Sequence, residues 1–402
     1  MPRLSIAVVS DLHIGGARSR DLCPKDPPDV PDENYVDRFR AHAATHGIQS
    51  DIVLCPGDAT QGLDPAEVQR SAQVLREIAT ALGVADDKIY YTPGNHDVDW
   101  SAMRIPDTTG FRRTQRFEPM RAGGGHLDQW CRLGSGVLLE APHVSVVDSP
   151  DIRLALVNTV AHDGPDSKVH HGAVSQESVE ALDQALQSLA QTDSPRVCLL
   201  HHHPIQYTNP LPDDVDFSVM SNAENLLSVL AQHRFDILVH GHRHSPRVVT
   251  YSVNGSHPLV IVGAGSFSAR LDSRWAGIVN NQFHIIRVDG RTSQGCVKGQ
   301  VESWAYVASS GWVPSQQHNG IAHLRRFGLH LVPADLDARI AAVFSAVSPG
   351  GAPFDDVKFF EHDPEMRLVA NEALEQSLGR VCKELGYERY GDITGNFLLT
   401  RR

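Results

Sequence analysis

The sequence predicts an α/β fold in which helices flank layered sheets, and three observations lead to this prediction. Short apolar runs alternate with amphipathic helical patterns through the first half of the chain. The strand candidates in this part are apolar throughout, as expected for strands buried on both faces. From residue 247 onward, consecutive β-like runs replace the alternation, which indicates a second sheet packed on the first.

The elements of the first half follow in βα order. They are a strand at 4–9, a helix at 34–46, a strand at 51–55, a helix at 64–82 begun by Asp64 and Pro65, and a strand at 88–91. The pattern breaks down over 101–136, where Pro106, three consecutive glycines and several arginines occur. We interpret this stretch as an insertion that lies over the sheet edge, near the active site.

Regular structure resumes after the insertion. The predicted elements are strands at 137–140, 143–147 and 154–158, a helix at 176–190, a strand at 196–200, a helix at 222–233, a strand at 236–239, and β-like runs at 247–253, 259–262 and 282–288. The tail contains Trp304, Trp312 and helical stretches near 335–344 and 365–385. We therefore expect one domain over 1–293 and a C-terminal α+β appendage over 294–402, whose role the sequence does not indicate.

Composition excludes several classes of protein. Lys plus Arg total 36 against 48 for Asp plus Glu, and a net charge of −12 disfavours non-specific coating of nucleic acid or of anionic membranes. A hydrophobic fraction of 41% excludes predominant disorder, and no apolar run is long enough for a transmembrane helix. The six cysteines lack the spacing of disulfide frameworks or zinc fingers, and the first strand begins almost at once. We expect a cytoplasmic protein.

Polar motifs follow five of the predicted strands. They are Asp11-Leu12-His13, Gly57-Asp58, Gly94-Asn95-His96-Asp97, His201-His202-His203-Pro204 and Gly241-His242-Arg243-His244. Open α/β sheets bind ligands at the carboxyl ends of their strands. Each motif alone is common, but five of them at strand ends indicate one site. Carboxylates, an amide oxygen and imidazoles suit Mn, Fe or Zn ions, and a glycine before a ligand permits a sharp turn.

The five motifs resemble those of the calcineurin-like metallophosphoesterases, whose pattern is D-x-H, G-D, G-N-H-[DE], H-x-P and G-H-x-H. The resemblance covers roughly residues 1–290. It implies the metallophosphoesterase fold, a two-layer β-sandwich flanked by helices. It also implies two divalent or trivalent metal ions, about 3.5–4 Å apart.

The resemblance also assigns roles to individual residues. The implied ligands are Asp11, His13 and His244 for the first metal, Asn95, His202 and His242 for the second, and Asp58 for both. Among the three consecutive histidines, His202 is preferred as the ligand because the family's ligand stands two positions before the proline. His203 would then be a neighbour of the substrate. A hydroxide that bridges the metals would attack phosphorus in line. His96 would protonate the leaving oxygen, and Asp97 would fix the tautomer of His96.

Departures from the motifs of individual subfamilies narrow the range of expected substrates. The sequence after Asp58 lacks the GDxVDRG motif of protein phosphatases, and the GNHEFD motif of secreted 5′-nucleotidases is absent. The segments 199–204 and 171–175 resemble bacterial class III cyclic-nucleotide phosphodiesterases, although Asn158-Thr159 stands where that subfamily has Asp-Ser. The segment 10–15 equally resembles the exonuclease branch. We expect a phosphodiesterase acting on a cyclic nucleotide or related nucleotide diester. The alternatives are a nuclease, a phosphomonoesterase and a non-catalytic metal-binding scaffold.

The insertion contains five arginines within a short stretch. These are Arg104, Arg112, Arg113, Arg116 and Arg121. Arg112, Arg113 and Arg116 are candidates for contacting a second phosphate or a nucleic-acid backbone. Alternatively, the arginines form a solvated face that pairs with Asp107 and Glu118. The expected partner is a phosphoester substrate, with nucleic acid as an alternative and no membrane, and the sequence leaves the oligomeric state open.

Overall fold

The computed structural model describes residues 3–15, 35–104, 115–123, 127–131, 138–163, 171–207, 218–252, 257–271, 278–308, 310–391, 393 and 396–401. The chain forms two compact units. We name them the N-terminal unit (Leu4–Ile286 and Glu302–His323) and the C-terminal unit (Met1–Arg3, Arg287–Val301 and Leu324–Arg402). The boundary expected after residue 293 falls between the strands β10 (Gln282–Arg291) and β11 (Val297–Val307) and stays a prediction.

The first sheet has seven strands in the order β12-β11-β10-β1-β2-β3, with β13 paired to β11. Its strands are β1 (Leu4–Val8), β2 (Ile52–Cys55), β3 (Ile89–Tyr91), β10 (Gln282–Arg291), β11 (Val297–Val307), β12 (Gly311–Pro314) and β13 (Leu324–Phe327). β1, β2 and β3 are parallel and fully buried, as the apolar runs predicted. The connecting helices are α1 (Tyr35–His46) and α2 (Pro65–Ala81), and the Asp64 carboxylate caps α2 by accepting from the Ala66 N–H.

The second sheet has six strands in the order β4-β5-β6-β7-β9-β8. Its strands are β4 (Val144–Asp148), β5 (Arg153–Val157), β6 (Arg196–Leu199), β7 (Ile237–His240), β8 (Arg247–Tyr251) and β9 (Leu259–Gly263). β5, β6, β7 and β9 are parallel, and β4 and β8 are antiparallel edge strands. Helices α6 (Gln176–Gln187) and α7 (Ala223–Gln232) bury their apolar faces against this sheet, with Leu182, Leu226 and Leu230 in the shared core.

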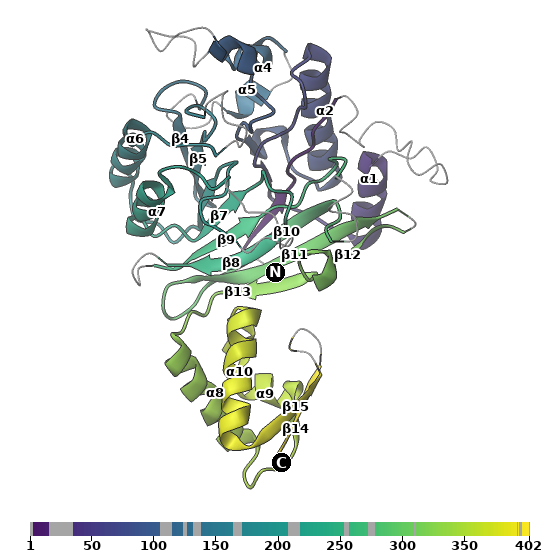
Figure 1. Cartoon of the computed structure of the whole chain (residues 1–402), viewed down its shortest axis with the longest axis vertical. Helices are drawn as coiled ribbons and strands as arrows, with labels where there is room; N and C mark the ends of the chain where they lie inside the picture. Colours follow the sequence, from purple (N-terminus) through teal and green to yellow (C-terminus); the bar gives the residue numbers. More distant parts are fainter. Residues whose placement is uncertain are drawn as a thin grey trace. The chain divides into compact units, whose positions relative to one another are not determined.

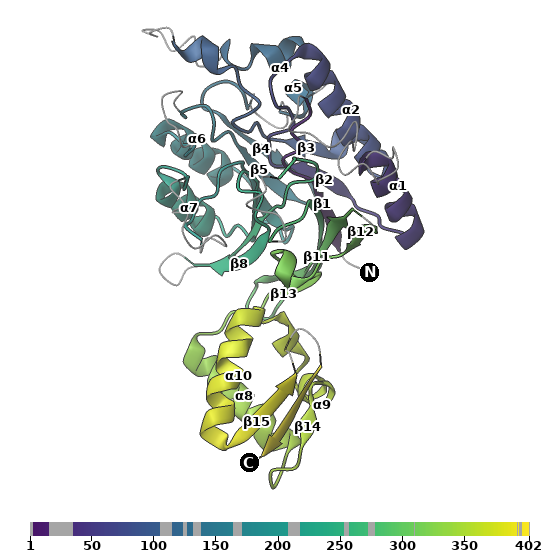
Figure 2. The same cartoon turned by 45° about the vertical axis from the view of Figure 1, so that its right-hand side comes forward.

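The N-terminal unit is layered as helix, sheet, sheet and helix. Figures 1 and 2 show α1 and α2 on one side of the strands and α6 and α7 on the other. The predicted fold class is confirmed, because the chain has a mixed α/β architecture in which two sheets are flanked by helices. The strand expected at 137–140 is wrong in its described part, since residues 138–140 form a turn.

The described part of the insertion contains short helices. They are a 3-10 helix at Trp100–Arg104, α4 (Glu118–Ala122) and α5 (Leu127–Trp130). Further 3-10 helices occupy Asp86–Lys88 and Gln317–Asn319. α5 packs against β3, the edge strand of the first sheet, and the Cys131 Sγ lies 3.7 Å from the Tyr91 carbonyl oxygen.

The C-terminal unit has its own hydrophobic core. Its elements are α8 (Pro333–Val347), β14 (Phe354–Asp355), α9 (Asp356–His362), a 3-10 helix at Pro364–Leu368, α10 (Asn371–Leu385), β15 (Tyr387–Gly391) and β16 (Phe397–Arg401). Phe344, Phe354 and Phe359 pack in the core between the helices and the sheet β14-β16-β15. The helix expected over 365–385 is divided at Val369 and Ala370, and α9 and the three strands were not predicted.

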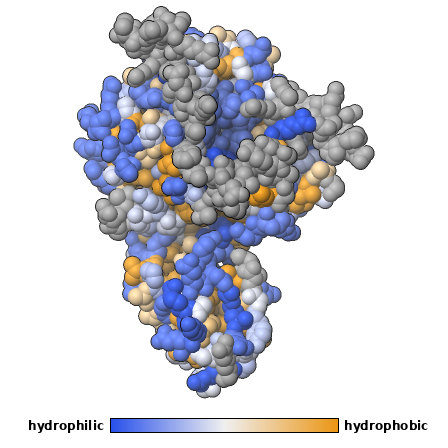
Figure 3. Space-filling model, viewed as in Figure 1, coloured by the Kyte–Doolittle hydropathy of each residue, from blue (hydrophilic) through white to orange (hydrophobic). Residues whose placement is uncertain are grey.

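Apolar residues lie mainly inside the protein. Hydrophilic residues cover most of the coloured surface in Figure 3, and hydrophobic residues form smaller patches. Within the described part of the chain, no helix combines the length and the apolar character that crossing a membrane requires.

Candidate metal centre

The five polar motifs lie where parallel strands end. The strands β1, β2 and β3 of the first sheet lead to Asp11, Asp58 and Asn95, and β6 and β7 of the second sheet lead to the other two motifs. The carboxyl ends of both sheets therefore contribute side chains to one site, as expected for an α/β fold. Two serines missed by the sequence analysis hold the first motif: Ser266 Oγ donates to the Asp11 carbonyl at 2.7 Å, and Ser268 Oγ donates to the Leu12 carbonyl at 2.8 Å.

The backbone of the site is strained. Nine non-glycine residues in the described part of the chain have a positive φ, and five of them belong to the motifs. These five are Asp11 (51°), His13 (50°), Asp58 (52°), His242 (75°) and His244 (52°). A left-handed conformation costs about 1–3 kcal/mol at a non-glycine residue and persists where the surrounding structure enforces it. Such a concentration of strain is typical of a functional site.

Gly94 permits the close approach of two of these loops. A Cβ at residue 94 would collide with the backbone nitrogen and the carboxylate of Asp58. Gly57 adopts φ 97°, a conformation that favours glycine. The expectation that glycines bring the ligands together is confirmed at these positions.

Three side chains form the first subsite. His13 Nε2 lies 3.0 Å from His244 Nε2, and His244 Nε2 lies 3.3 Å from Asp11 Oδ1. Two imidazole nitrogens and a carboxylate oxygen therefore face one point, which is the arrangement of a metal site. The carboxylate of Asp58 borders this subsite, since its Oδ2 atom is 3.7 Å from His13 Nε2.

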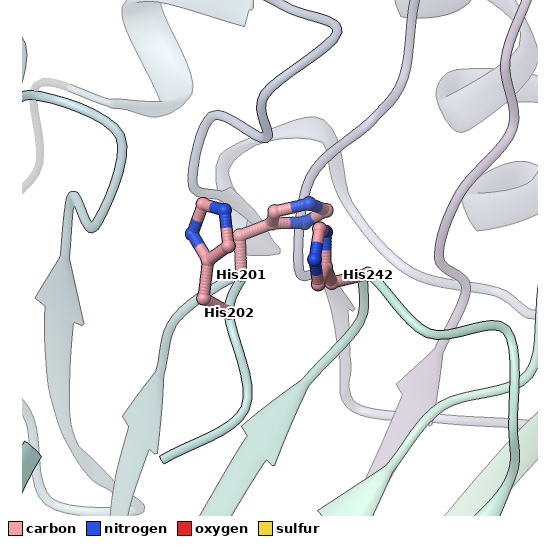
Figure 4. Close-up of side chains that lie close together, drawn as sticks. All are labelled: His201, His202 and His242. Atoms are coloured by element: carbon pink, nitrogen blue, oxygen red, sulfur yellow. The ribbon is translucent and has the colours of Figure 1, made fainter. Parts of the chain in front are cut away.

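The second subsite lies on the other side of Asp58. Asn95 Oδ1 lies 3.1 Å from His201 Nε2 and 3.0 Å from His242 Nδ1. His201 Nε2 is also 3.5 Å from Asp58 Oδ2. His201 Nδ1 donates to the Pro56 carbonyl at 2.7 Å, which leaves the Nε2 lone pair directed at the subsite. Figure 4 shows how the rings of His201, His202 and His242 gather at the ends of β6 and β7.

This geometry favours His201 over His202 as the ligand, contrary to the sequence prediction. His202 Nδ1 lies 2.8 Å from Thr159 Oγ1, and its Nε2 is 4.0 Å from Asp163 Oδ2. Residues 201 and 202 form a bend after β6. His201 faces Pro56 and Asn95, whereas the His202 ring lies against His242 and reaches Thr159 after the end of β5. The count backward from proline selects His202, which lies in the same group of three histidines, and we propose His201 in its place.

The electrostatics of the site fit a pair of cations. Burial raises the pKa of Asp58 to about 8, and the nearby carboxylates of Asp11 and Asp97 add to this effect although His96 opposes it. Burial lowers the pKa of His13 and His242 well below 6.5, so these imidazoles are neutral and able to coordinate. Bound cations would offset the repulsion among the buried carboxylates, and the oxygen and nitrogen donors suit Mn, Fe or Zn ions.

His96 lies beside the first subsite, but Asp97 does not orient it. The Asp97 carboxylate accepts backbone N–H groups from Thr60 and Gly94, each at 2.8 Å, and from Ala59 at 3.2 Å. It therefore joins the Asp58 and Asn95 loops. The predicted contact between Asp97 and the His96 ring is replaced by a contact with Gln61, whose Nε2 lies 3.1 Å from His96 Nδ1.

Of the four residues predicted to contact the substrate, two are buried inside the protein and two lie outside the described residues. Arg116 is fully buried, and its Nη1 donates to the Val160 carbonyl at 2.7 Å and to the Asp163 carbonyl at 3.2 Å, which favours a structural role. His203 is also fully buried, with its ring 5.7 Å from that of Tyr207. Arg112 and Arg113 lie outside the described residues.

A cavity of about 530 Å³ opens beside His96. It is lined by Gln61, Gly62, Leu63, Asn95, His96, Val98, Asp99, Trp100 and Ser101. The Trp100 indole donates from Nε1 to the Asn95 carbonyl at 2.8 Å, which fixes its ring next to the second subsite. Gln61 and Trp100 were not predicted as site residues, and their only indication in the sequence is that they follow the second and third motifs.

The chain is similar to one protein-family model and to several solved structures. No curated protein matches the chain. A similar solved structure is a dimetal phosphatase from Danio rerio, with 13% identity, coverage of 78% of this chain and 96% of that one, and a TM-score of 0.44. Another is the purple acid phosphatase PPD1 from yellow lupin, with 12% identity, coverage of 78% and 53%, and a TM-score of 0.47.

A third similar solved structure is the NAD nucleotidase of Haemophilus influenzae, with 11% identity, coverage of 96% of this chain and 61% of that one, and a TM-score of 0.38. The family model for the calcineurin-like phosphoesterases matches residues 4–246, which is more than half of the chain. This chain therefore belongs to the calcineurin-like phosphoesterase family.

Proposed function

We propose that the protein is a dinuclear metal-dependent phosphodiesterase that hydrolyses a nucleotide diester, such as a cyclic nucleotide. One observation carries the proposal: the Oδ2 atom of Asp58 lies 3.7 Å from His13 Nε2 and 3.5 Å from His201 Nε2. A single carboxylate oxygen thus faces both subsites. Asp11, His13 and His244 would hold the first metal, and Asn95, His201 and His242 the second, with Asp58 shared.

Two bound cations would lower the pKa of a coordinated water and neutralise charge on the phosphoryl group. The neighbouring side chains position the substrate. His96 lies at the boundary between the first subsite and the cavity, with its ring centroid 4.8 Å from that of His13. From there it can donate a hydrogen bond to a phosphoryl or leaving-group oxygen.

The cavity beside His96 supports an organic leaving group and a singly charged phosphate. Leu63, Val98 and Trp100 supply apolar and aromatic surface of the kind that binds a nucleoside. None of the described residues that line it is a lysine or arginine, and Asp99 is acidic. A phosphate monoester carries about −1.5 to −2 charge at neutral pH. A diester carries only one charge and is therefore better suited to this lining.

Two of the arginines that suggested a nuclease make other contacts in the structure. Arg116 is committed to backbone carbonyls inside the protein, and Arg121 pairs with Glu118 at 2.8 Å and with Glu140 at 3.4 Å. Neither guanidinium is directed at a nucleic-acid backbone. We therefore retain cleavage of single-stranded DNA as an outcome of the test.

A substrate panel tests the proposal. The protein loaded with Mn²⁺ is assayed with bis-p-nitrophenyl phosphate, p-nitrophenyl phosphate, 3′,5′-cAMP and single-stranded DNA. We expect at least one small diester to be cleaved faster than the monoester. Faster cleavage of the monoester than of every diester would contradict the proposal, and preferential cleavage of DNA would favour the nuclease.

Two variants control for the metal centre. Asp58→Asn preserves the shape of the shared ligand but removes its charge, and we expect it to lose bound metal and activity together. Asp86→Asn removes a carboxylate from an exposed ion pair with Arg76 and should leave both unchanged. A protein that binds two metals and hydrolyses none of the substrates would instead support the scaffold alternative.

We also place the protein in a reducing compartment such as the cytoplasm. In the described part of the chain, Cys55, Cys198 and Cys382 are buried thiols outside any disulfide. Such cysteines are typical of proteins that do not depend on disulfides.

A further inference from the structure

We propose that Gln61 is a positioning residue that links the first metal subsite to His96, an inference that rests on the phosphoesterase function proposed above. Gln61 is the third residue after Asp58, and its backbone N–H donates to the Ile14 carbonyl at 2.9 Å. Its side-chain amide lies between two imidazoles. Oε1 is 2.9 Å from His13 Nδ1, and Nε2 is 3.1 Å from His96 Nδ1.

His13 directs one ring nitrogen at the metal subsite and the other at Gln61. Its Nε2 atom faces His244 and Asp58 in the metal subsite, so this nitrogen must present a lone pair to a cation. The proton of the neutral ring is then on Nδ1, where it requires an acceptor. Gln61 Oε1 is that acceptor, and it thereby fixes the ring orientation and the tautomer of a metal ligand.

The contact with His13 also determines which end of the Gln61 amide faces His96. With Oε1 directed at His13, the amide presents its N–H group to His96 Nδ1, which must accept. The proton of the neutral His96 ring is consequently on Nε2. His96 therefore enters the reaction as an Nε2–H donor to a substrate oxygen. The Asp97 carboxylate, which the sequence predicted to orient this ring, accepts backbone N–H groups instead.

A glutamine can perform both tasks because its amide carries one acceptor and one donor. Glutamate would still accept from His13 but could not donate to His96. Methionine has a similar length but offers neither a donor nor a strong acceptor. The variants Gln61→Glu and Gln61→Met therefore separate the two halves of the proposal. Gln73→Met is the matched control, because Gln73 Nε2 donates to Glu77 on the exposed face of α2.

Calorimetric titration with Mn²⁺ tests the contact with His13. Loss of a partner that orients a ligand typically weakens metal binding 10–100-fold. We expect Gln61→Met to weaken the affinity for one Mn²⁺ at least tenfold, and Gln61→Glu and Gln73→Met to stay within about threefold of the parent protein. Unchanged Mn²⁺ affinity in a folded Gln61→Met protein would overturn the proposal that Gln61 orients His13.

Titration of the Mn²⁺-saturated protein with inorganic phosphate tests the contact with His96 without relying on turnover. A hydrogen bond to a charged group contributes about 1.5–3 kcal/mol, or roughly tenfold or more in affinity. We expect Gln61→Glu to bind phosphate about tenfold more weakly and to lose a similar factor in kcat on the preferred substrate. Parental phosphate affinity in Gln61→Glu would overturn this half. If the parent protein hydrolyses no substrate, the proposed function fails while both titrations still decide the role of Gln61.

Discussion

His201 and His202 are chemically identical neighbours in the chain, and the structure gives them different partners. His201 contacts Asn95 and lies near Asp58, whereas His202 contacts Thr159. Both rings are fully buried, so burial does not distinguish them. The distinguishing feature is the surroundings of Nε2. In His201 this atom lies 3.1 Å from Asn95 Oδ1 and 3.5 Å from Asp58 Oδ2, whereas in His202 it lies 4.0 Å from Asp163 Oδ2.

This difference predicts the metal content of two matched variants. His201→Gln removes a donor that faces Asn95 and Asp58, so we expect it to retain about one Mn²⁺ per chain. His202→Gln should retain two. Metal content is measured by atomic spectroscopy after gel filtration, with circular dichroism to confirm folding. Two metals in His201→Gln together with one in His202→Gln would restore the assignment made from the sequence.

His284 predicts a dependence of stability on pH away from the metal centre. Its Nε2 accepts the Gly265 N–H at 3.1 Å, and its Nδ1 lies 2.8 Å from Ser303 Oγ. Burial lowers the pKa of this imidazole from 6.5 to about 3. Between these values the unfolded chain binds more protons than the folded one, so acid favours unfolding. The contribution to stability is full above pH 6.5 and is lost as the pH falls toward 3.

We therefore expect His284→Gln, which retains one donor and one acceptor, to lose less stability in acid than the parent protein. For this one group, the free energy of unfolding should fall by about 2 kcal/mol less in the variant between pH 7 and pH 5. Urea unfolding in the presence of EDTA measures this difference and excludes effects of metal binding. Equal losses in the two proteins would show that folding does not lower the pKa of His284.

The loops that follow the strands show which parts of the site are predictable from sequence. Asp11, Asp58, Asn95 and His242 follow buried apolar runs, and strand geometry brings such positions to one edge. The end of β6 was less predictable, since three consecutive histidines follow the strand and a shift of one residue exchanges their partners. Gln61 could not be assigned from its spacing alone, because its role depends on contacts with rings from two other loops.

The close approach of the Gly94 loop to Asp58 predicts that the arrangement of these two loops controls metal binding. A Cβ at this position would collide with the backbone nitrogen and the carboxylate of Asp58, so Gly94→Ala must displace the shared ligand. We expect Mn²⁺ affinity to fall at least tenfold while the sheets remain folded. Calorimetry measures the affinity, and Gly379→Ala is the control because a Cβ at residue 379 of α10 meets open space. Parental affinity in Gly94→Ala would show that the two loops separate without cost.

The two units differ in what holds them together. The N-terminal unit contains the buried carboxylates of Asp11 and Asp58, which a pair of cations would stabilise. The C-terminal unit relies on an apolar core and on ion pairs between its elements, such as Arg380 on α10 with Asp337 on α8 at 2.8 Å. The sequence predicted the change in character near residue 294 but not the small sheet, because β14 has only two residues and β15 begins with no clear alternation.

Removal of metal should therefore destabilise one unit and not the other. A ligand that binds only the folded state adds about 2.7 kcal/mol at a free concentration 100 times its Kd. We expect EDTA to lower the melting temperature of the N-terminal unit by several degrees and to leave that of the C-terminal unit within about one degree. Differential scanning calorimetry of the whole chain measures both. Gly379→Ala identifies the second transition, because alanine stabilises an exposed helical position such as this one by about 1 kcal/mol relative to glycine. A single transition that responds to both EDTA and Gly379→Ala would show instead that the two units unfold together.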